Sequence, residues 1–279
     1  MFLFQASLCL IACYFQSVYI YALVSLLSIA KLIAYSRSSP LELHYDEHEA
    51  GSLGKEFVER SQIRKMRFEP YLWAPHCISQ GFFYLLSEMI LKRFILKEFN
   101  REEIILPDGA TIGLDWDGEI PDPSVKPDKP YLLICPGLGG DSRNLYSLKV
   151  LYQARSQGYK VATILARGAG GLKMTTPKLN CAASWRDIEH AIDYFYEKYG
   201  CDAKTKEKHS RIYAYGVSQG AMLLALYLGR AGKKTSDILD GASVFSSVWN
   251  ADVGGPWFIN NWNGFYNKVI GLNLNKNIK

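Results

Sequence analysis

The stretch Arg211–Leu228, RIYAYGVSQGAMLLALYL, decides the fold expected for this chain. An apolar segment rich in β-forming residues leads into Gly216-Val217-Ser218-Gln219-Gly220, and an apolar segment with helical spacing follows. A serine between two glycines, preceded by a strand and followed by a helix, is the pattern of a nucleophile elbow. In such a turn the strained serine backbone exposes its hydroxyl above a sheet, and small residues at 216 and 220 let strand and helix approach closely. The pattern predicts that Ser218 is a catalytic nucleophile.

The segments around this stretch alternate between strand and helix patterns. Strands are expected at residues 102–106, 111–116, 131–135, 160–165 and 241–247, the last of them buried. The first two are joined by Pro107-Asp108-Gly109 and predict a hairpin. The later strands are separated by helical segments, which indicates a mostly parallel sheet with helices on both faces. Ligands in such sheets bind beyond the carboxyl ends of the strands, where the glycine-rich loops of this chain fall.

Two helices between these strands carry their own boundary signals. Residues 145–157 predict a helix that stops at Gly158, a residue suited to the position after a helix end. Ser184 and Asp187 form a Ser-x-x-Asp pattern, which predicts a capping box at the start of the next helix. The apolar positions of that helix have helical spacing and predict its buried face: Ile188, Ala191, Ile192, Phe195 and Tyr199.

The loop after the expected strand 131–135 is Pro136-Gly137-Leu138-Gly139-Gly140. A serine nucleophile needs backbone N–H donors that stabilise the oxyanion of the tetrahedral intermediate. One donor follows the nucleophile, here Gln219, and another comes from the loop after the third strand, for which we choose Leu138. Gly137 lets this loop approach the substrate. A phosphate-binding loop is the alternative, but the Gly-Lys-Ser/Thr that it requires is missing, and so is a dinucleotide fingerprint.

Composition excludes several other classes of protein. The chain has 279 residues, is 48% hydrophobic and carries a net charge of +5, with its basic residues scattered. Nucleic-acid binding is therefore not expected. The six cysteines include no Cys-x-x-Cys pair, so neither a zinc site nor a disulfide framework is indicated. We expect no metal and no other cofactor.

The amino-terminal segment predicts a membrane anchor. No charged residue occurs from Phe2 to Ala30, which exceeds the roughly 20 residues that cross a bilayer as a helix. A cleaved signal peptide and a buried core helix are the alternatives, and a signal peptide is disfavoured because a basic segment before the apolar run is missing. We therefore expect a single-pass anchor over residues 1–35. Basic residues follow it and predict a cytosolic catalytic domain, at the endoplasmic reticulum or another endomembrane: Lys31, Arg37, Lys55, Arg60, Arg64, Lys65 and Arg67.

Two further domains follow the expected anchor. Residues 36–98 predict a juxtamembrane connector with a short helix near Lys55–Lys65, whose basic side chains form a solvated face or contact anionic headgroups. His76 has no partner motif and is interpreted as structural. Residues 99–279 predict the catalytic core, and the aromatic segment 248–265 predicts the start of a lid.

Five motifs together resemble one known family. They are LDW (114–116), PGLGG (136–140), ARGAGGLKMTTPKL (166–179), SWRD (184–187) and GVSQGA (216–221). The region from about Pro70 to Ser247 is similar to the membrane-anchored esterase branch of the α/β-hydrolase superfamily. That branch includes animal α/β-hydrolase-domain phospholipases, yeast medium-chain acyl ester synthases, and bacterial and plant relatives. The resemblance implies an α/β-hydrolase fold and a serine hydrolase whose partners are lipid or fatty-acyl esters and the bilayer.

The chain departs from this family in two ways. Pro136 stands where members carry a histidine at the start of the oxyanion loop. In addition, the family's acid and base follow the serine along the chain. All five histidines precede Ser218: His44, His48, His76, His190 and His209. Asp237, Asp240 and Asp252 come too early to be the usual acid. The triad Asp and His are therefore not expected in this chain.

These departures predict a fold that is truncated after its sixth strand. One interpretation is a partial gene product. The other is a short protein that kept the fold and lost turnover, and it leads to the alternative function of a catalytically inactive membrane scaffold or lipid-binding module. Removing the base of a triad lowers the rate by several orders of magnitude, although the oxyanion hole still contributes.

Overall fold

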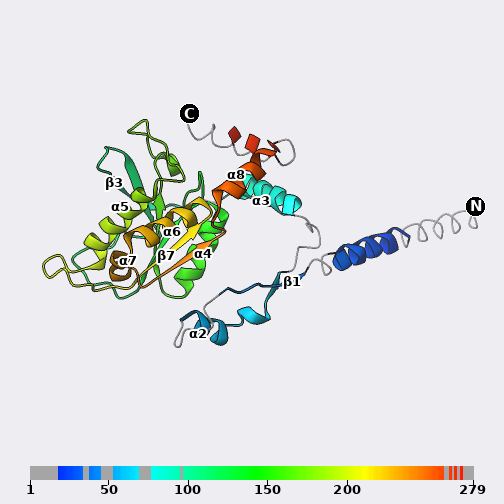
Figure 1. The fold of residues 1–279 in the computed structure, drawn as a ribbon, viewed down its shortest axis with the longest axis horizontal. Helices are drawn as coiled ribbons and strands as arrows, with labels where there is room; N and C mark the ends of the chain where they lie inside the picture. Colours follow the sequence, from blue (N-terminus) through cyan, green and yellow to red (C-terminus); the bar gives the residue numbers. More distant parts are fainter. Residues whose placement is uncertain are drawn as a thin grey trace, which may run out of the picture. The chain divides into compact units, whose positions relative to one another are not determined.

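The computed structural model describes residues 18–33, 38–44, 53–68, 77–94 and 97–260, together with 264–265, 267–268 and 271–272 (Figure 1). The chain divides into two compact units, Met1–Ile90 and Leu91–Lys279. The first unit contains helices and a two-stranded sheet, and the second contains the main sheet.

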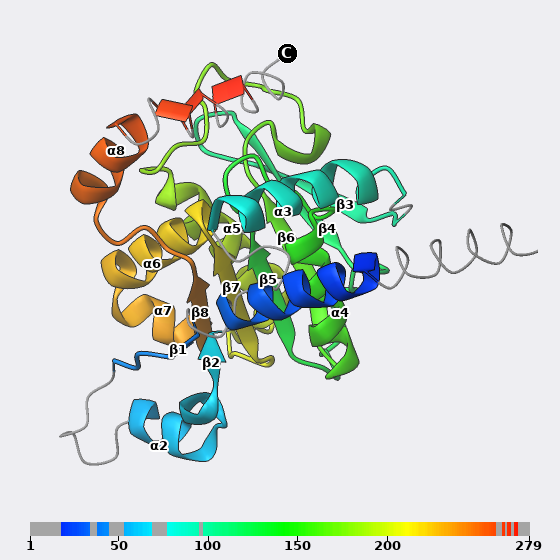
Figure 2. The same cartoon turned by 90° about the vertical axis from the view of Figure 1, so that its right-hand side faces the viewer.

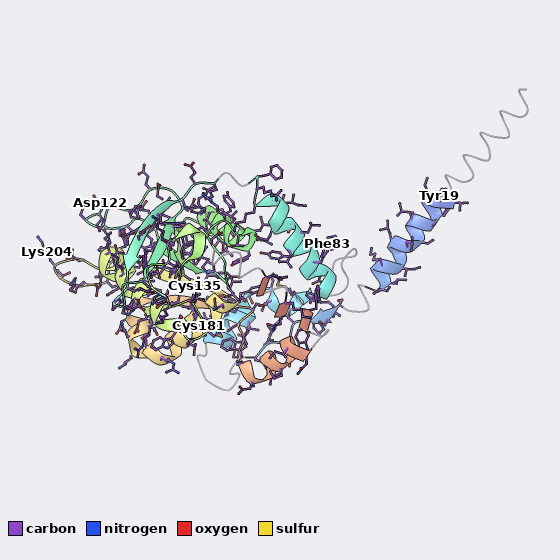
Figure 3. The ribbon with its side chains drawn as sticks, turned by 90° about the horizontal axis from the view of Figure 1, so that it is seen from above. Tyr19, Phe83, Asp122, Cys135, Cys181 and Lys204 are labelled. Carbon is purple, nitrogen blue, oxygen red and sulfur yellow. The ribbon has the colours of Figure 1, made fainter. Side chains whose placement is uncertain are left out.

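The first unit begins with a helix over residues 18–33. Its side chains are exposed, as the labelled Tyr19 illustrates with 72% exposure (Figure 3). Residues 1–17 and 34–35 of the expected anchor lie outside the described residues. Within the part of the chain that is described, no helix combines the length and the apolar character needed to cross a bilayer.

The connector contains two-residue strands and helical segments of 3 to 15 residues. They are β1 Ser39–Pro40, α2 Leu53–Arg60, η1 Ile63–Lys65, β2 Arg67–Phe68 and α3 Cys77–Leu91, of which β1 and β2 pair antiparallel. The short helix expected near residues 55–65 corresponds to α2 and η1. His44 forms an exposed ion pair with Glu42, at 3.2 Å. His48 and His76 lie outside the described residues.

The second unit is built on a six-stranded mixed sheet with the order β3-β4-β6-β5-β7-β8. The hairpin β3-β4 is antiparallel, β4 pairs antiparallel with β6, and the remaining neighbours are parallel. The strands are β3 Asn100–Ile105, β4 Thr111–Trp116, β5 Tyr131–Cys135, β6 Lys160–Leu165, β7 Ile212–Val217 and β8 Gly241–Phe245. The predicted hairpin and the mostly parallel sheet are confirmed, with strand ends shifted by no more than two residues.

Helices cover both faces of this sheet (Figure 2). They are α4 Leu145–Ser156, α5 Trp185–Phe195, α6 Gln219–Ala231, α7 Lys233–Ile238 and α8 Ala251–Asn260, with short turns η2 Ala169–Gly171 and η3 Tyr196–Gly200. Because side chains of a strand alternate between faces, Leu133 and Cys135 join the core under α5 and α6, whereas Ile134 packs with Leu151 of α4. The larger core lies on the α5/α6 side.

The helix between β6 and β7 confirms one prediction and contradicts another. All five positions expected on its buried face are buried, including Tyr199 in η3. The prediction of a capping box is wrong, because the Ser184 side chain makes no capping hydrogen bond. The Ser184 hydroxyl accepts the Cys181 N–H at 3.1 Å, and the Asp187 carboxylate binds Arg167. A buried ion pair with a distant residue therefore replaces the local cap.

The expectation that the last strand is buried is also wrong. β8 pairs with β7 only, and Phe245 at its end is 61% exposed. α8, within the segment expected to begin a lid, has an exposed surface that includes Val253 at 69%. β8 is thus an edge strand with unpaired backbone groups on its outer side among the described residues.

The strand order also locates the binding crevice. The chain leaves β5 toward β6 on one side and then crosses back to β7 on the other side of β5. The loops after β5 and β7 therefore diverge, and a crevice opens between them at the carboxyl edge of the sheet. Gly137 lies in the loop after β5, and Ser218 directly follows β7.

Candidate active site

Ser218 lies in a strained turn between β7 and α6. Its backbone has φ 54° and ψ −116°, a region that residues other than glycine rarely adopt. Two hydrogen bonds hold it there: the Ser218 N–H donates to Phe245 O at 2.9 Å, and the Met222 N–H donates to Ser218 O at 3.0 Å. The residue is exposed. The sequence around it therefore folds into the sharp strand-to-helix turn that an elbow requires.

The two glycines of the turn leave no room for a side chain. A Cβ on Gly216 would lie 2.6 Å from Ala221 Cα, and a Cβ on Gly220 would lie 2.1 Å from Cys135 O. Both neighbours are backbone atoms, which cannot rotate away. α6 thus packs directly onto β7 and onto the end of β5, as the pattern of glycines predicts.

The loop after β5 lies against this turn. A Cβ on Gly137 would be 3.2 Å from Ser218 Cβ, so the loop passes too close to the turn to leave room for a side chain at position 137. Gly140 N–H donates to Gly137 O at 2.9 Å and closes a turn, in which Gly139 has φ 65°. In the part of the chain that the structure describes, the Leu138 and Gln219 N–H groups have no acceptor. Leu138 and Gln219 therefore remain the predicted oxyanion donors.

A cavity of about 620 Å³ opens beside these loops. Its wall includes Gly137, Leu138 and Gly220, while Ser218 itself is next to the wall and not part of it. Its lining includes the buried Arg167, Ser184 and Asp187, together with buried apolar residues of the sheet and of α5 and α6: Ile112, Ile164, Leu165, Ile188 and Leu223. A volume of this size and these apolar lining residues suit a small acyl chain.

The loop 166–180 forms the opposite wall and reaches the turn of Ser218. Asn180 Nδ2 donates to Gln219 Oε1 at 3.1 Å. Gly168 has φ 69°, and a Cβ there would lie 2.6 Å from Met174 Sδ. Met174 and Asn180 line the cavity, so this loop contributes side chains to it.

Cys135, the last residue of β5, also lines the cavity but is an unsuitable nucleophile. It is buried at 1% exposure, and burial raises the pKa of its thiol to about 12 (Figure 3 labels Cys135). Only the thiolate is a strong nucleophile. Ser218 is therefore the better candidate.

A buried arginine anchors the 166–180 loop. Arg167 Nε and Nη2 donate to the two carboxylate oxygens of Asp187 at 2.6 and 2.8 Å, and Nη1 donates to Asp108 Oδ2 at 2.7 Å. The hydrogen bond to Asp187 is the main reason that the pKa of Arg167 is raised. The bidentate geometry ties the loop after β6 to α5 and to the β3-β4 turn.

A second buried network connects both walls of the cavity. Asp115 accepts hydrogen bonds from Arg101 Nε at 2.6 Å and from the Ser142 hydroxyl at 2.5 Å, just after the β5 loop. Arg101 Nη1 donates to Gly170 O at 2.7 Å, in the opposite wall. Asp115 is 3% exposed. One carboxylate thus holds the β5 loop, and through Arg101 also the 166–180 loop.

These networks account for charged residues in three of the five motifs that carry the family resemblance. LDW contains Asp115, ARGAGG contains Arg167 and Gly170, and SWRD contains Asp187. The pairing of these residues was not visible in the sequence. Charged residues next to apolar strand ends were the only available signal.

Asp240 and His209 lie near the opposite end of β7 from Ser218. Asp240 Oδ2 accepts the Ile212 N–H at 2.8 Å, and Ile212 begins β7, whereas Ser218 follows its end. His209 Nε2 is 3.2 Å from Tyr199 O and also precedes β7. None of the described histidines lines the cavity. Across the described ranges, no group of three His, Cys, Asp or Glu side chains is arranged to hold a metal ion.

Comparisons with known proteins agree with this geometry. No family model matches the chain. It is 33% identical over 173 residues to the phospholipase ABHD3 of Homo sapiens, a match that covers 59% of this chain and 39% of that protein. It is 29% identical over 126 residues to the medium-chain fatty acid ethyl ester synthase/esterase 2 of Saccharomyces cerevisiae, covering 44% of this chain and 25% of the relative.

Solved structures of esterases are similar as well. The esterase Pf2001 of Pyrococcus furiosus aligns with a TM-score of 0.45 and 16% identity, over 63% of this chain and 61% of that chain. The chain thus spans less than half the length of the two curated relatives described above. Over these regions the chain is similar in sequence to phospholipases and lipid esterases of the α/β-hydrolase superfamily.

Proposed function

We propose that this protein is a serine hydrolase of carboxylic esters of lipids or fatty acyl groups, with an acyl-Ser218 intermediate. The observation that carries the proposal is the strained backbone of Ser218, at φ 54° and ψ −116°, beside the β5 loop at Gly137, where a side chain would not fit. Backbone strain of this kind persists where the surrounding structure enforces it, which is common at active sites. The buried apolar residues that line the adjacent cavity support an acyl group as the substrate's apolar part.

In this reaction Ser218 Oγ attacks the ester carbonyl carbon while a base removes the hydroxyl proton. The carbonyl π electrons move to the oxygen, and the Leu138 and Gln219 N–H groups donate to the resulting oxyanion. Collapse of the tetrahedral intermediate breaks the bond to the alcohol, which leaves with a proton. Water or a second alcohol then attacks the acyl-serine by the same route. Each oxyanion donor contributes roughly 3 to 4 kcal/mol to such a reaction.

The reactivity of Ser218 is tested directly with a fluorophosphonate probe on the full chain. We expect one covalent adduct, located on Ser218 by peptide mass spectrometry and lost in Ser218→Ala. Ser246→Ala is the matched control, because Ser246 also has positive φ, 56°, but follows β8. Hydrolysis of short- and medium-chain acyl esters that depends on Ser218 supports the enzyme. A folded protein that binds acyl chains but neither labels nor hydrolyses them supports the inactive lipid-binding alternative.

We infer that residues 1–35 anchor the protein in a membrane, with the catalytic unit on the cytosolic side of the endoplasmic reticulum or another endomembrane. The uncharged run Phe2–Ala30 and the basic residues that follow it support this proposal. An anchor would keep the active site near bilayer lipids.

The anchor is tested by alkaline carbonate extraction of cell membranes. Wild type should stay in the membrane pellet, and Leu23→Lys with Leu27→Lys should release it, because each lysine costs roughly 2.5 to 3.5 kcal/mol near the bilayer centre. Val125→Lys with Val253→Lys adds the same charge at exposed positions of the second unit and should change nothing. Release of wild type by carbonate contradicts the anchor. Digestion of a carboxyl-terminal tag by protease added to sealed microsomes checks the cytosolic orientation.

A further inference from the structure

The hydroxyl of Tyr146, in the first turn of α4, occupies the inside of the β5 loop. Gly137 N–H donates to Tyr146 Oη at 3.0 Å. A Cβ on Gly140 would lie 2.3 Å from the same oxygen. The hydroxyl therefore contacts both ends of the turn Gly137-Leu138-Gly139-Gly140 and explains why a glycine is needed at position 140.

The hydroxyl and the turn of Ser218 both border the position of Gly137. Ser218 Cβ and Tyr146 Oη are 3.2 and 3.6 Å from the position that a Cβ on Gly137 would take. The phenol thus supports the loop at the point where it contacts the turn of Ser218. A shift of this loop would move the Leu138 N–H relative to Ser218 Oγ.

The bond from Gly137 further determines which N–H groups of the loop can reach a substrate. Gly137 N–H is bound to Tyr146, Gly140 N–H to Gly137 O, and Asp141 N–H to Asn144 Oδ1. Within the described chain, the Leu138 N–H points to no protein acceptor. Because the Tyr146 hydroxyl accepts the Gly137 N–H, it orients the peptide plane before Gly137. Together with the turn, this bond also orients the Leu138 N–H.

We propose that Tyr146 is a positioning residue for the oxyanion loop: its hydroxyl accepts the Gly137 N–H and keeps the Leu138 N–H aligned with the carbonyl that Ser218 attacks. The inference rests on the proposed function. It makes Tyr146 act through the loop and not on the substrate. The β5 loop is then held at two points, by Tyr146 at its start and by Ser142 with Asp115 at its end.

The test compares Tyr146→Phe with Tyr152→Phe in the full chain. Both variants remove one hydroxyl from α4. Tyr152 lies later in this helix than Tyr146, is 46% exposed, and contacts Lys97 and Arg155 through its ring. Labelling by the fluorophosphonate probe is measured as a maximal rate and a half-saturating concentration. Tyr146→Phe should lower the maximal rate by about tenfold or more with little change in half-saturation, since small misplacements of reacting groups are costly. Tyr152→Phe should match wild type.

A double-mutant cycle with Gly140→Ala separates positioning from general loss of structure. The added methyl group meets the Tyr146 hydroxyl in wild type, and Tyr146→Phe removes that oxygen. The rate loss from Gly140→Ala should therefore be severalfold smaller in the Tyr146→Phe background. Additive losses, or an unchanged maximal rate in Tyr146→Phe, overturn the inference.

Hydrogen exchange gives a readout that does not depend on catalysis. Peptides that cover residues 136–144 should take up deuterium faster in Tyr146→Phe than in wild type or Tyr152→Phe, because the Gly137 N–H loses its acceptor. If wild type does not label with the probe, the proposed function fails, and exchange alone decides on Tyr146. Unchanged exchange in this loop overturns the inference in either case.

Discussion

At the scale of single residues, the turn at Ser218 depends on what two glycines lack. Strand β7 and helix α6 meet there with backbone atoms in contact, and the serine takes a backbone conformation that costs about 1–3 kcal/mol. The surrounding backbone bonds of Ser218, to Phe245 and Met222, hold this conformation. The exposure of the hydroxyl is therefore a property of the turn and not of the serine itself.

We predict that Gly220→Ala is destabilising and abolishes labelling of Ser218. The new methyl group would meet Cys135 O at 2.1 Å and Pro136 O at 2.4 Å, so α6 must move away from β5. We expect a loss of roughly 1–3 kcal/mol in the free energy of unfolding, measured by urea denaturation.

Gly229→Ala in the same helix is the control. No atom lies within 4 Å of its added Cβ, so the variant should gain roughly 0.5–1 kcal/mol and label normally. Equal stability of the two variants would contradict the packing described here.

At the scale of elements, ion pairs determine where the two walls of the cavity stand. The 166–180 loop has little regular structure, yet Arg167 connects it to α5 and Arg101 connects it to β3 and β4. The Arg167 side chain is 3% exposed, so its charge has lost its hydration and is stabilised by its carboxylate partners. The shape of the cavity follows from these pairs.

The two partners of Arg167 should differ in importance. Asp187, 10% exposed, makes the bidentate contact, and Asp187→Asn should cost about 3 kcal/mol in the free energy of unfolding because it leaves a buried guanidinium poorly neutralised. Asp108, 41% exposed, makes one bond, and Asp108→Asn should cost clearly less. Chemical denaturation of both variants checks the order, and a larger loss at Asp108 would refute this account.

At the scale of the whole second unit, a buried carboxylate connects the first strand to the helical layer. Glu102 of β3 accepts hydrogen bonds from Lys198, Tyr194, Tyr199 and Trp116. Burial by itself would raise the pKa of Glu102, but these donors outweigh it, so the pKa lies below its usual value. The ionised form therefore stabilises the fold.

This shift has a defined effect on acid stability. Because the folded-state pKa of Glu102 is lowered, its contribution is complete above the unfolded pKa of roughly 4.3 and is lost as pH falls through the lower folded value. Glu102→Gln should therefore flatten the fall in unfolding free energy below about pH 4.5. Thermal or urea unfolding from pH 7 to pH 3 measures it. Glu103→Gln, at the exposed neighbour, should keep the wild-type slope, and parallel profiles for wild type and Glu102→Gln would contradict the role of this carboxylate.

The sequence predicted the framework of the second unit because strands and helices leave short-range patterns. The apolar runs of β5 and β6 match their predicted ranges, and Gly158, at φ 86°, follows α4 as expected. The turn at Ser218 was predictable for the same reason, since its strand, two glycines and helix lie within one stretch. The anchor over residues 1–35 stays a prediction.

Only the tertiary structure decided which distant residues are in contact. Asp187 pairs with Arg167 from 20 residues away and so does not form the local capping box, and Arg101 reaches Gly170 across 69 residues. β8 is exposed because burial of a strand depends on neighbours on both sides, which its apolar sequence does not reveal. The Tyr146 hydroxyl enters the β5 loop only because α4 packs there. By itself, the sequence determined which segments form strands, helices and the turn at Ser218. The packing of those segments decided which side chains surround the serine, because a contact between distant residues depends on the path of the whole chain.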